Sequence, residues 1–374
     1  MLFKKNYPEL DLLRAIAIVL VMLFHFQQTT FNLTGSPYFS KFLDRGYHGV
    51  DLFFVLSGFL IGGQLIESLR AGRFSFKEFY IKRFFRIAPA YYMAIMVSVL
   101  YYSVWTNMFV LRDDHFLKEF FIHIFYLQDY IPVLTQAGLY WSLAVEEQFY
   151  ILIPGLIFIF HGRREGRLFG FLLLFILAGF SMKFFIYDLL LDPSKEWSLY
   201  FYRPLHMRFD SLLLGVFSAL AFITYRDKLR QSAIAYKVAL YSVTAVCLGL
   251  TLFYGSFGHG YFNSVWQFIL SGIGFSTLVL ATATFSKPEM PLQWLFKPVA
   301  RFSYAMYLYH MMIKVIFINF LARYFTVDNT LAINYLIVFA VYFAVVFLLC
   351  GVHYLLIENP FLNFRKRLLS RMQY

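Results

Sequence analysis

Residues 10–26 read LDLLRAIAIVLVMLFHF, an apolar run that contains an arginine, Arg14, and a histidine, His25. Comparable apolar runs recur along the whole chain, and about 18 such residues are enough to cross a bilayer as a helix. A helix satisfies its own backbone hydrogen bonds, which lipid cannot do. The sequence therefore predicts an all-α, polytopic membrane protein with about ten transmembrane helices.

The composition supports the same class. Of the 374 residues 60% are hydrophobic and 14% are charged, whereas soluble domains are about 25% charged. This excludes a disordered chain. The formal charge is +12, but the basic residues stand in short loops between apolar runs, which is typical of membrane topology rather than of nucleic-acid binding. The two cysteines, Cys247 and Cys350, both fall in apolar runs and provide no CxxC motif.

We expect a single domain, 1–374, with ten spans. The expected spans are 11–29, 48–67, 87–105, 139–160, 168–190, 204–224, 236–254, 265–284, 299–321 and 331–357. The segment 116–134 is too short to cross and is expected to be interfacial or re-entrant. The first run resembles a signal peptide but has no small-residue cleavage site, so we interpret it as a retained helix.

The basic residues predict the orientation. With ten spans, the basic stretches fall on one side: the N-terminus, the loops 68–86, 161–167, 225–237 and 285–301, and the C-terminus. The positive-inside rule then places both termini in the cytoplasm.

Arg14 and His25 are the first candidate pair. Eleven residues correspond to three helical turns, so they share one face about 16–17 Å apart, and Asp11 lies one turn before Arg14. The alternative is that Arg14 is a cytoplasmic anchor and His25 a hydrogen-bonded packing residue. A buried histidine needs a partner, however, and a neutral imidazole can act as a general base. His25 is therefore the predicted catalytic base, with Arg14 and Asp11 beside it.

Two further runs carry polar residues at the outer starts of spans. WSLAVEEQFY at 141–150 holds Glu146 and Glu147, which point about 100° apart on a helix. We expect only one to face the site squarely and choose Glu146; an interfacial acidic pair is the alternative. GVDLFFVLSGFLI at 49–61 holds Asp51 and Ser57, which could instead be an N-cap and a packing residue. Ser57 as a nucleophile would lack a base beside it in sequence.

The remaining candidates are more ambiguous. Arg208 and Asp210 could bind the acceptor or form an ion pair that joins two helices. Tyr309 lies in the ninth span next to His310, and His310 stands one turn before Lys314. The predicted acceptor-side residues are Asp51, Ser57, Arg208, Asp210 and Tyr309. No metal site is expected.

Arg83 and Arg86 lie on the predicted cytoplasmic side. They could be ordinary topological anchors or an anion site for phosphates, which arginine binds well. An anion site on one side and polar groups in the outer half suggest transfer across the membrane.

These stretches resemble the acyltransferase-3 family of membrane acyltransferases. The matching segments are LDLLRAIAIVLVMLFHF, GVDLFFVLSGFLI, KRFFRIAPAYY, WSLAVEEQFY, RFDSLLLG and RFSYAMYLYH. The resemblance implies a ten-helix core that O-acylates glycans, lipids or small molecules, usually with acetyl-CoA as donor. It also implies that His25 is catalytic and Arg14 essential, that Arg83 and Arg86 form the RxxR motif, and that Glu146 is the family glutamate. Some relatives carry a fused esterase-like domain, and we expect this chain to be a stand-alone core.

The predicted function is acyl transfer from cytosolic acyl-CoA, which is a substrate and not a bound cofactor, to a glycan or lipid-linked glycan at the outer side of a bacterial inner membrane. A lipopolysaccharide O-antigen is the expected acceptor. The alternative is an exporter of a glycan or lipid intermediate. Paired broken helices or inverted repeats would favour this alternative. The oligomeric state and the length of the acyl group stay open.

Overall fold

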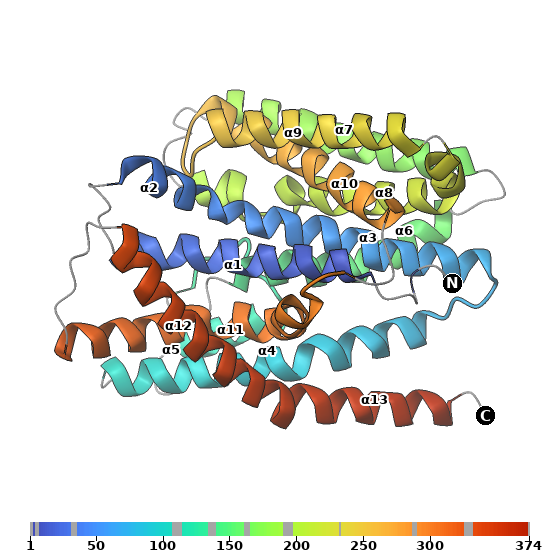
Figure 1. The fold of residues 1–374 in the computed structure, drawn as a ribbon. Helices are drawn as coiled ribbons and strands as arrows, with labels where there is room; N and C mark the ends of the chain where they lie inside the picture. Colours follow the sequence, from blue (N-terminus) through green and yellow to red (C-terminus); the bar gives the residue numbers. More distant parts are fainter. Residues whose placement is uncertain are drawn as a thin grey trace.

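The computed structural model describes residues 3, 7–30, 36–106, 114–133, 140–160, 165–189, 197–231, 233–285, 290–324 and 332–372. Throughout these residues the regular structure is helical (Figure 1). The helices of the N-terminal half are α1 (Pro8–Thr30), α2 (Pro37–Leu43), η2 (Asp44–His48), α3 (Gly49–Arg70), α4 (Phe76–Thr106), α5 (Asp114–Ile124), α6 (Trp141–Phe160) and α7 (Glu165–Leu189). Those of the C-terminal half are η5 (Ser198–Tyr202), α8 (Leu205–Gln231), α9 (Ala233–Tyr254), η6 (Phe262–Trp266), α10 (Gln267–Phe285), α11 (Gln293–Tyr324), α12 (Ala332–His353), η7 (Tyr354–Glu358) and α13 (Asn359–Arg371).

Each of the ten expected spans coincides with a helix. Within the described ranges, nine helical stretches are long and apolar enough to cross a membrane. The first expected span forms a further helix, α1, of 23 residues. The all-α, multi-pass class is therefore confirmed. α5 has only 11 residues, shorter than a span, and its interfacial or re-entrant placement stays a prediction.

Small residues allow α3 and α8 to approach closely. A Cβ atom on Gly58 would lie 2.0 Å from the carbonyl oxygen of Leu212, and one on Gly215 would lie 2.3 Å from that of Val55. Close backbone contact at glycine is a common way of packing helices in lipid. On the outside of the bundle, α7 and α9 expose apolar side chains such as Leu174 and Val246, as lipid-facing helices do.

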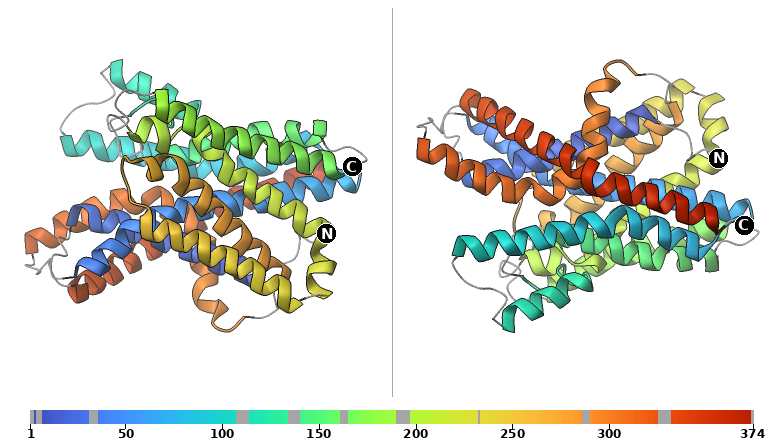
Figure 2. Two further views of the ribbon diagram at one scale, coloured as in Figure 1. Left: turned by 90° about the horizontal axis from the view of Figure 1, so that it is seen from above. Right: turned by 90° about the horizontal axis from the view of Figure 1, so that it is seen from below.

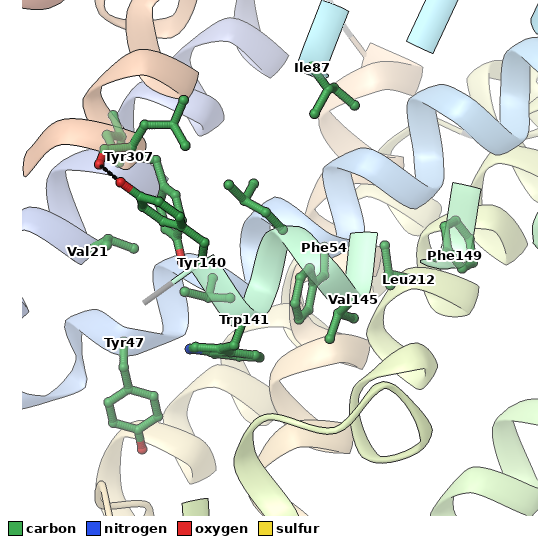
Figure 3. Close-up of a cluster of buried hydrophobic side chains, with 14 of the residues drawn as sticks. Val21, Tyr47, Phe54, Ile87, Tyr140, Trp141, Val145, Phe149, Leu212 and Tyr307 are labelled. Atoms are coloured by element: carbon green, nitrogen blue, oxygen red, sulfur yellow. Dashed lines mark hydrogen bonds between the residues drawn. The ribbon is translucent and has the colours of Figure 1, made fainter. Parts of the chain in front are cut away.

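The start of α6 is held by an aromatic cluster (Figure 3). Tyr140 and Trp141 are both buried, and the Tyr140 hydroxyl donates a hydrogen bond of 2.7 Å to the carbonyl oxygen of Leu308 on α11. Trp141 packs against Phe54 of α3, with 6.2 Å between the ring centroids. These contacts fix α6 between α3 and α11, the three helices that build most of the site.

The beginning of α1 and the end of α13 lie at the same end of the bundle (Figure 2). The turn between α3 and α4 lies at this end too (Figure 1). This arrangement agrees with an even number of spans and with basic residues gathered at one end, which we call the basic end.

Candidate active site

His25 of α1 faces His310 of α11. The two ring centroids are 5.1 Å apart, and Nε2 of His310 lies 3.3 Å from Nδ1 of His25. Each Nδ1 also lies near a carbonyl oxygen of its own helix: that of Val21 at 2.9 Å for His25, and that of Tyr307 at 2.8 Å for His310. His310 is buried with 1% of its surface exposed, and His25 is half-buried.

These contacts determine the tautomers. A carbonyl oxygen can only accept, so each Nδ1 near it carries the hydrogen. Nε2 of His310 then accepts from the same Nδ1–H of His25. A neutral His25 therefore has its lone pair on Nε2, which is the nitrogen that could take a proton from a substrate. No described residue makes a hydrogen bond to this atom.

The backbone around the pair is also tied across helices. Nζ of Lys314 donates a 2.9 Å hydrogen bond to the carbonyl oxygen of His25. The Tyr342 hydroxyl of α12 donates to the carbonyl oxygen of His310 at 2.7 Å, and the Tyr335 hydroxyl to that of Leu23 at 2.8 Å. Three helices thus hold the two imidazoles in one relative position.

A cavity of about 150 Å³ opens between α1, α3, α4, α6 and α11. Its polar lining residues are Arg14, Ser57, Arg83, Arg86, Ser142, Glu146, Glu147, Tyr150, Ser303, Tyr304 and Tyr307. Arg14 Nη1 donates to Asp11 Oδ1 at 3.1 Å, which confirms that these two residues share a face. The Tyr307 ring lies 5.7 Å from the His310 ring. Tyr307 thus adjoins both this cavity, which we call the inner cavity, and the histidine pair.

The two glutamates both line the inner cavity, although adjacent helical positions suggested that only one would. Oε2 of Glu146 accepts a 2.8 Å hydrogen bond from the Tyr150 hydroxyl, and its other polar neighbours are Ser57, Arg83 and Arg14. Oε1 of Glu147 is buried and has no partner among the described residues.

The arginines of α4 reach further inward than the sequence suggested. Arg83 and Arg86 were expected on the cytoplasmic surface, at a depth opposite to Glu146, but all three line the inner cavity. The expected span began near residue 87, but α4 begins at Phe76. Arg83 is therefore seven residues into the helix, about 10 Å from its start. Arg86 Nη1 donates to Glu358 Oε2 at 3.1 Å.

Two more cavities continue from Arg83 to the basic end. A cavity of about 90 Å³ is lined by Arg14, Ser57, Arg83 and Tyr150, among others. A larger one of about 620 Å³, the outer cavity, has as its charged lining residues Glu67, Arg73, Glu78, Lys82, Arg83 and Arg365. Because Arg83 lines all three, the cavities adjoin one another, and together we call them the path.

Asp51 and Arg208 lie away from this path. They form an ion pair with each other, and Asp51 Oδ2 also bonds to His48 Nδ1 at 2.7 Å and Ser271 Oγ at 3.1 Å. The guanidinium of Arg208 lies 3.9 Å from the ring centroid of Phe268. Both side chains are at most 1% exposed.

Asp210 and Tyr309 are also separate from the cavities. Asp210 forms a buried ion pair with Lys183 of α7, and Tyr309 packs edge-on against His353. The arrangement of Asp51, Arg208 and Asp210 corresponds to the structural alternative, ion pairs between helices. Their role toward an acceptor, like that of Tyr309, stays a prediction.

The segment after α5 supports α6 from the side. Gln148 Nε2 donates to Asp129 Oδ1 at 2.9 Å and to the carbonyl oxygen of Tyr126 at 2.6 Å. Burial raises the pKa of Asp129 to about 6. These bonds hold α6 in place at Gln148, the residue next to Glu147.

The sequence pattern did not assign His310 and Lys314 to the site. His310 is the last residue of RFSYAMYLYH, and Lys314 follows one turn later. A histidine and a lysine so close together in an apolar run are the signal that could have identified them. Their partner His25 is distant in sequence, so only the fold brings the three together.

The fold and the site define a multi-pass membrane protein with a histidine pair next to an arginine-lined path. The family model described as an acyltransferase domain, that of the acyltransferase-3 family, matches residues 7–355, and the chain belongs to this family. The predicted family and its class, an acyltransferase enzyme, are therefore confirmed.

Two relatives show the similarity in detail. The peptidoglycan O-acetyltransferase OatA of Listeria monocytogenes is 29% identical over 331 residues, which cover 82% of this chain and 49% of the relative. The O-acetyltransferase OatA of Staphylococcus aureus is 26% identical over 329 residues, 83% of this chain and 51% of the relative. The chain thus spans about half the length of these curated relatives. No solved structure matches it.

Proposed function

We propose that this protein transfers an acetyl group from cytosolic acetyl-CoA to a hydroxyl of a cell-envelope glycan, with His25 as general base. The observation that carries the proposal is the path of three cavities that leads from the basic end through Arg83 to Tyr307, beside the histidine pair. The membrane would be the bacterial cytoplasmic membrane, with the basic end in the cytoplasm.

The outer cavity suits the nucleotide part of the donor. Four basic side chains line it, against two acidic ones, and Glu78 is already paired with Lys82. Arginines bind phosphate oxygens with charge-assisted hydrogen bonds. The rings of Phe74 and Phe79 also line it and offer flat surfaces to an adenine. The thin pantetheine arm would then pass Arg83 into the inner cavity.

The chemistry follows from the free Nε2 of His25. As the acceptor oxygen attacks the thioester carbon, Nε2 takes the hydroxyl proton. The C–O bond forms, the C–S bond breaks, and the proton passes from the imidazolium to the departing thiolate of CoA. The products are the O-acetyl ester and free CoA, without an acyl-enzyme intermediate. A positioned base of this kind typically contributes about 10²–10⁴-fold.

The names of the relatives support a glycan acceptor. Both are O-acetyltransferases, and the Listeria relative is named for peptidoglycan. A hydroxyl-bearing glycan at the outer side could approach the half-buried His25 from the end of α1 opposite to the basic end.

The test is a comparison of envelope glycans from cells with and without the gene. Mild alkali releases O-linked acetate, which is then quantified per sugar. We expect the strain without the gene to lose one class of O-acetyl ester. Unchanged ester content together with a missing surface glycan would replace the proposal with the exporter function.

A further inference from the structure

We propose that His310 is a positioning residue for His25: it accepts a hydrogen bond from Nδ1–H of His25 and thereby keeps the lone pair of the base on Nε2. The inference rests on the proposed function of His25. It assigns the pair a task in turnover that is separate from donor binding.

The geometry carries this assignment. His310 Nδ1 is committed to the carbonyl oxygen of Tyr307 at 2.8 Å, so its Nε2 can only accept. That acceptor lies 3.3 Å from Nδ1 of His25. If His25 adopted the other tautomer, two lone pairs would face each other, and the carbonyl oxygen of Val21 would lose its donor as well.

A neutral acceptor is suited to this location. His310 is 1% exposed on a membrane-spanning helix, where an unpaired carboxylate would be costly to bury. An imidazole can orient the base without adding a charge. In more polar sites a carboxylate often accepts the hydrogen bond that orients a functional histidine. Here a second histidine would accept it.

The surrounding contacts make His310 rigid enough for this role. Its carbonyl oxygen accepts from Tyr342, and Lys314, one turn later, donates to the carbonyl oxygen of His25. The backbones of α1 and α11 are therefore joined at the same level as the two side chains. His310 does not line any of the three cavities of the path, so its loss should leave the donor site intact.

The experiment uses inverted membrane vesicles from the native host, which contain the native acceptor and expose the cytoplasmic face. Labelled acetyl-CoA is added outside, and alkali-labile label in the glycan is measured at several concentrations. His310→Leu removes the acceptor atom while keeping the bulk. His310→Gln places an amide oxygen near the position of Nε2. His353→Leu, at a half-buried histidine of α12 that makes no hydrogen bond to His25, is the matched control.

We expect His310→Leu to lower the maximal rate about 10- to 100-fold, the range typical for losing the partner of a functional histidine. The KM for acetyl-CoA should stay unchanged, His310→Gln should recover most of the rate, and His353→Leu should keep the wild-type rate. A wild-type rate in His310→Leu, or equal loss in the Leu and Gln variants, would overturn the assignment.

A second measurement does not depend on turnover or on the variants folding. The ¹⁵N signals of the His25 ring in the detergent-solubilised wild-type protein show which nitrogen carries the hydrogen. Protonation at Nδ1 supports the assignment, and protonation at Nε2 overturns it. If wild-type vesicles incorporate no label, the proposed function fails while this measurement still tests the pair. If His25→Ala is inactive and His310→Leu is fully active, only the inference fails.

Discussion

At the scale of single residues, Glu146 and Glu147 occupy neighbouring positions in one cavity but have different partners. Glu146 interacts with Tyr150, Ser57, Arg83 and Arg14, which would hold its carboxylate in place. We predict that Glu146→Gln lowers turnover in the vesicle assay by about 10- to 100-fold, because a hydrogen bond to a charged group contributes about 1.5–3 kcal/mol. The KM for acetyl-CoA should change little. An inactive Glu147→Gln beside a fully active Glu146→Gln would assign the role to the other carboxylate.

Arg83 is the residue at which donor binding is best tested. Its side chain lines all three cavities, and its buried Nε has no partner among the described residues. We predict that Arg83→Ala raises the KM for acetyl-CoA about 10-fold, the effect of losing one charge-assisted hydrogen bond. Lys228→Ala, at an exposed basic residue of α8, removes the same charge and should leave the KM unchanged. Equal KM values in the two variants would make Arg83 a topological anchor.

The sequence could predict these residues only within one helix. The eleven-residue spacing placed Arg14 and His25 on one face, and the structure has both in one continuous helix, α1. It could not pair His25 with His310, because periodicity says nothing about which face of another helix lies opposite. For the same reason Asp51 and Arg208 were recognisable as unusual residues, whereas their mutual ion pair was not.

At the scale of helices, the contact between α3 and α8 depends on glycine. A side chain at Gly58 would collide with the backbone of α8, which cannot move aside like a flexible side chain. We predict that Gly58→Ala lowers stability by about 1–3 kcal/mol, as overpacking usually does. Thermal unfolding of the solubilised protein measures this loss. Gly155→Ala on α6, where an added Cβ would meet no other part of the protein within 4 Å, is the control. Equal melting temperatures for the two variants would show that the helices separate without cost.

The ion pair of Lys183 and Asp210 joins α7 to α8 in the interior. Both side chains are 1% exposed, so removing one partner leaves a buried charge. We predict that Lys183→Met destabilises the protein by about 3–5 kcal/mol and that Lys183→Met with Asp210→Asn recovers part of this loss. Unfolding temperature and membrane abundance report the effect. A double variant less stable than Lys183→Met alone would contradict a purely structural pair.

The helices themselves were largely predictable, since each span appears as a hydropathy maximum. The residues at which the helices begin were less predictable. α4 extends to Phe76 through a stretch whose basic residues lower its mean hydropathy, and this extension is what brings Arg83 to Glu146. The π-helical turns η5, η6 and η7 likewise leave no trace in hydropathy.

At the scale of the whole molecule, the outer cavity and the histidine pair lie at different depths. The outer cavity opens near the basic end, while His25 lies toward the other end of α1. The inner cavity is lined by Arg83, which it shares with the outer cavity, and by Tyr307, whose ring lies 5.7 Å from that of His310. In the proposed function, the acyl group would pass from this donor side to an outer hydroxyl while the nucleotide stays on the cytoplasmic side.

The most direct test of this account compares labelled acetyl-CoA supplied to inverted and to right-side-out vesicles, each with the wild-type protein or His25→Ala at equal abundance. We predict alkali-labile acetyl label in the glycan only with inverted wild-type vesicles, and a loss of about 10²–10⁴-fold with His25→Ala. Equal labelling from both vesicle orientations would contradict a cytoplasmic donor site. Undiminished labelling by His25→Ala would contradict the central claim that this histidine is the base.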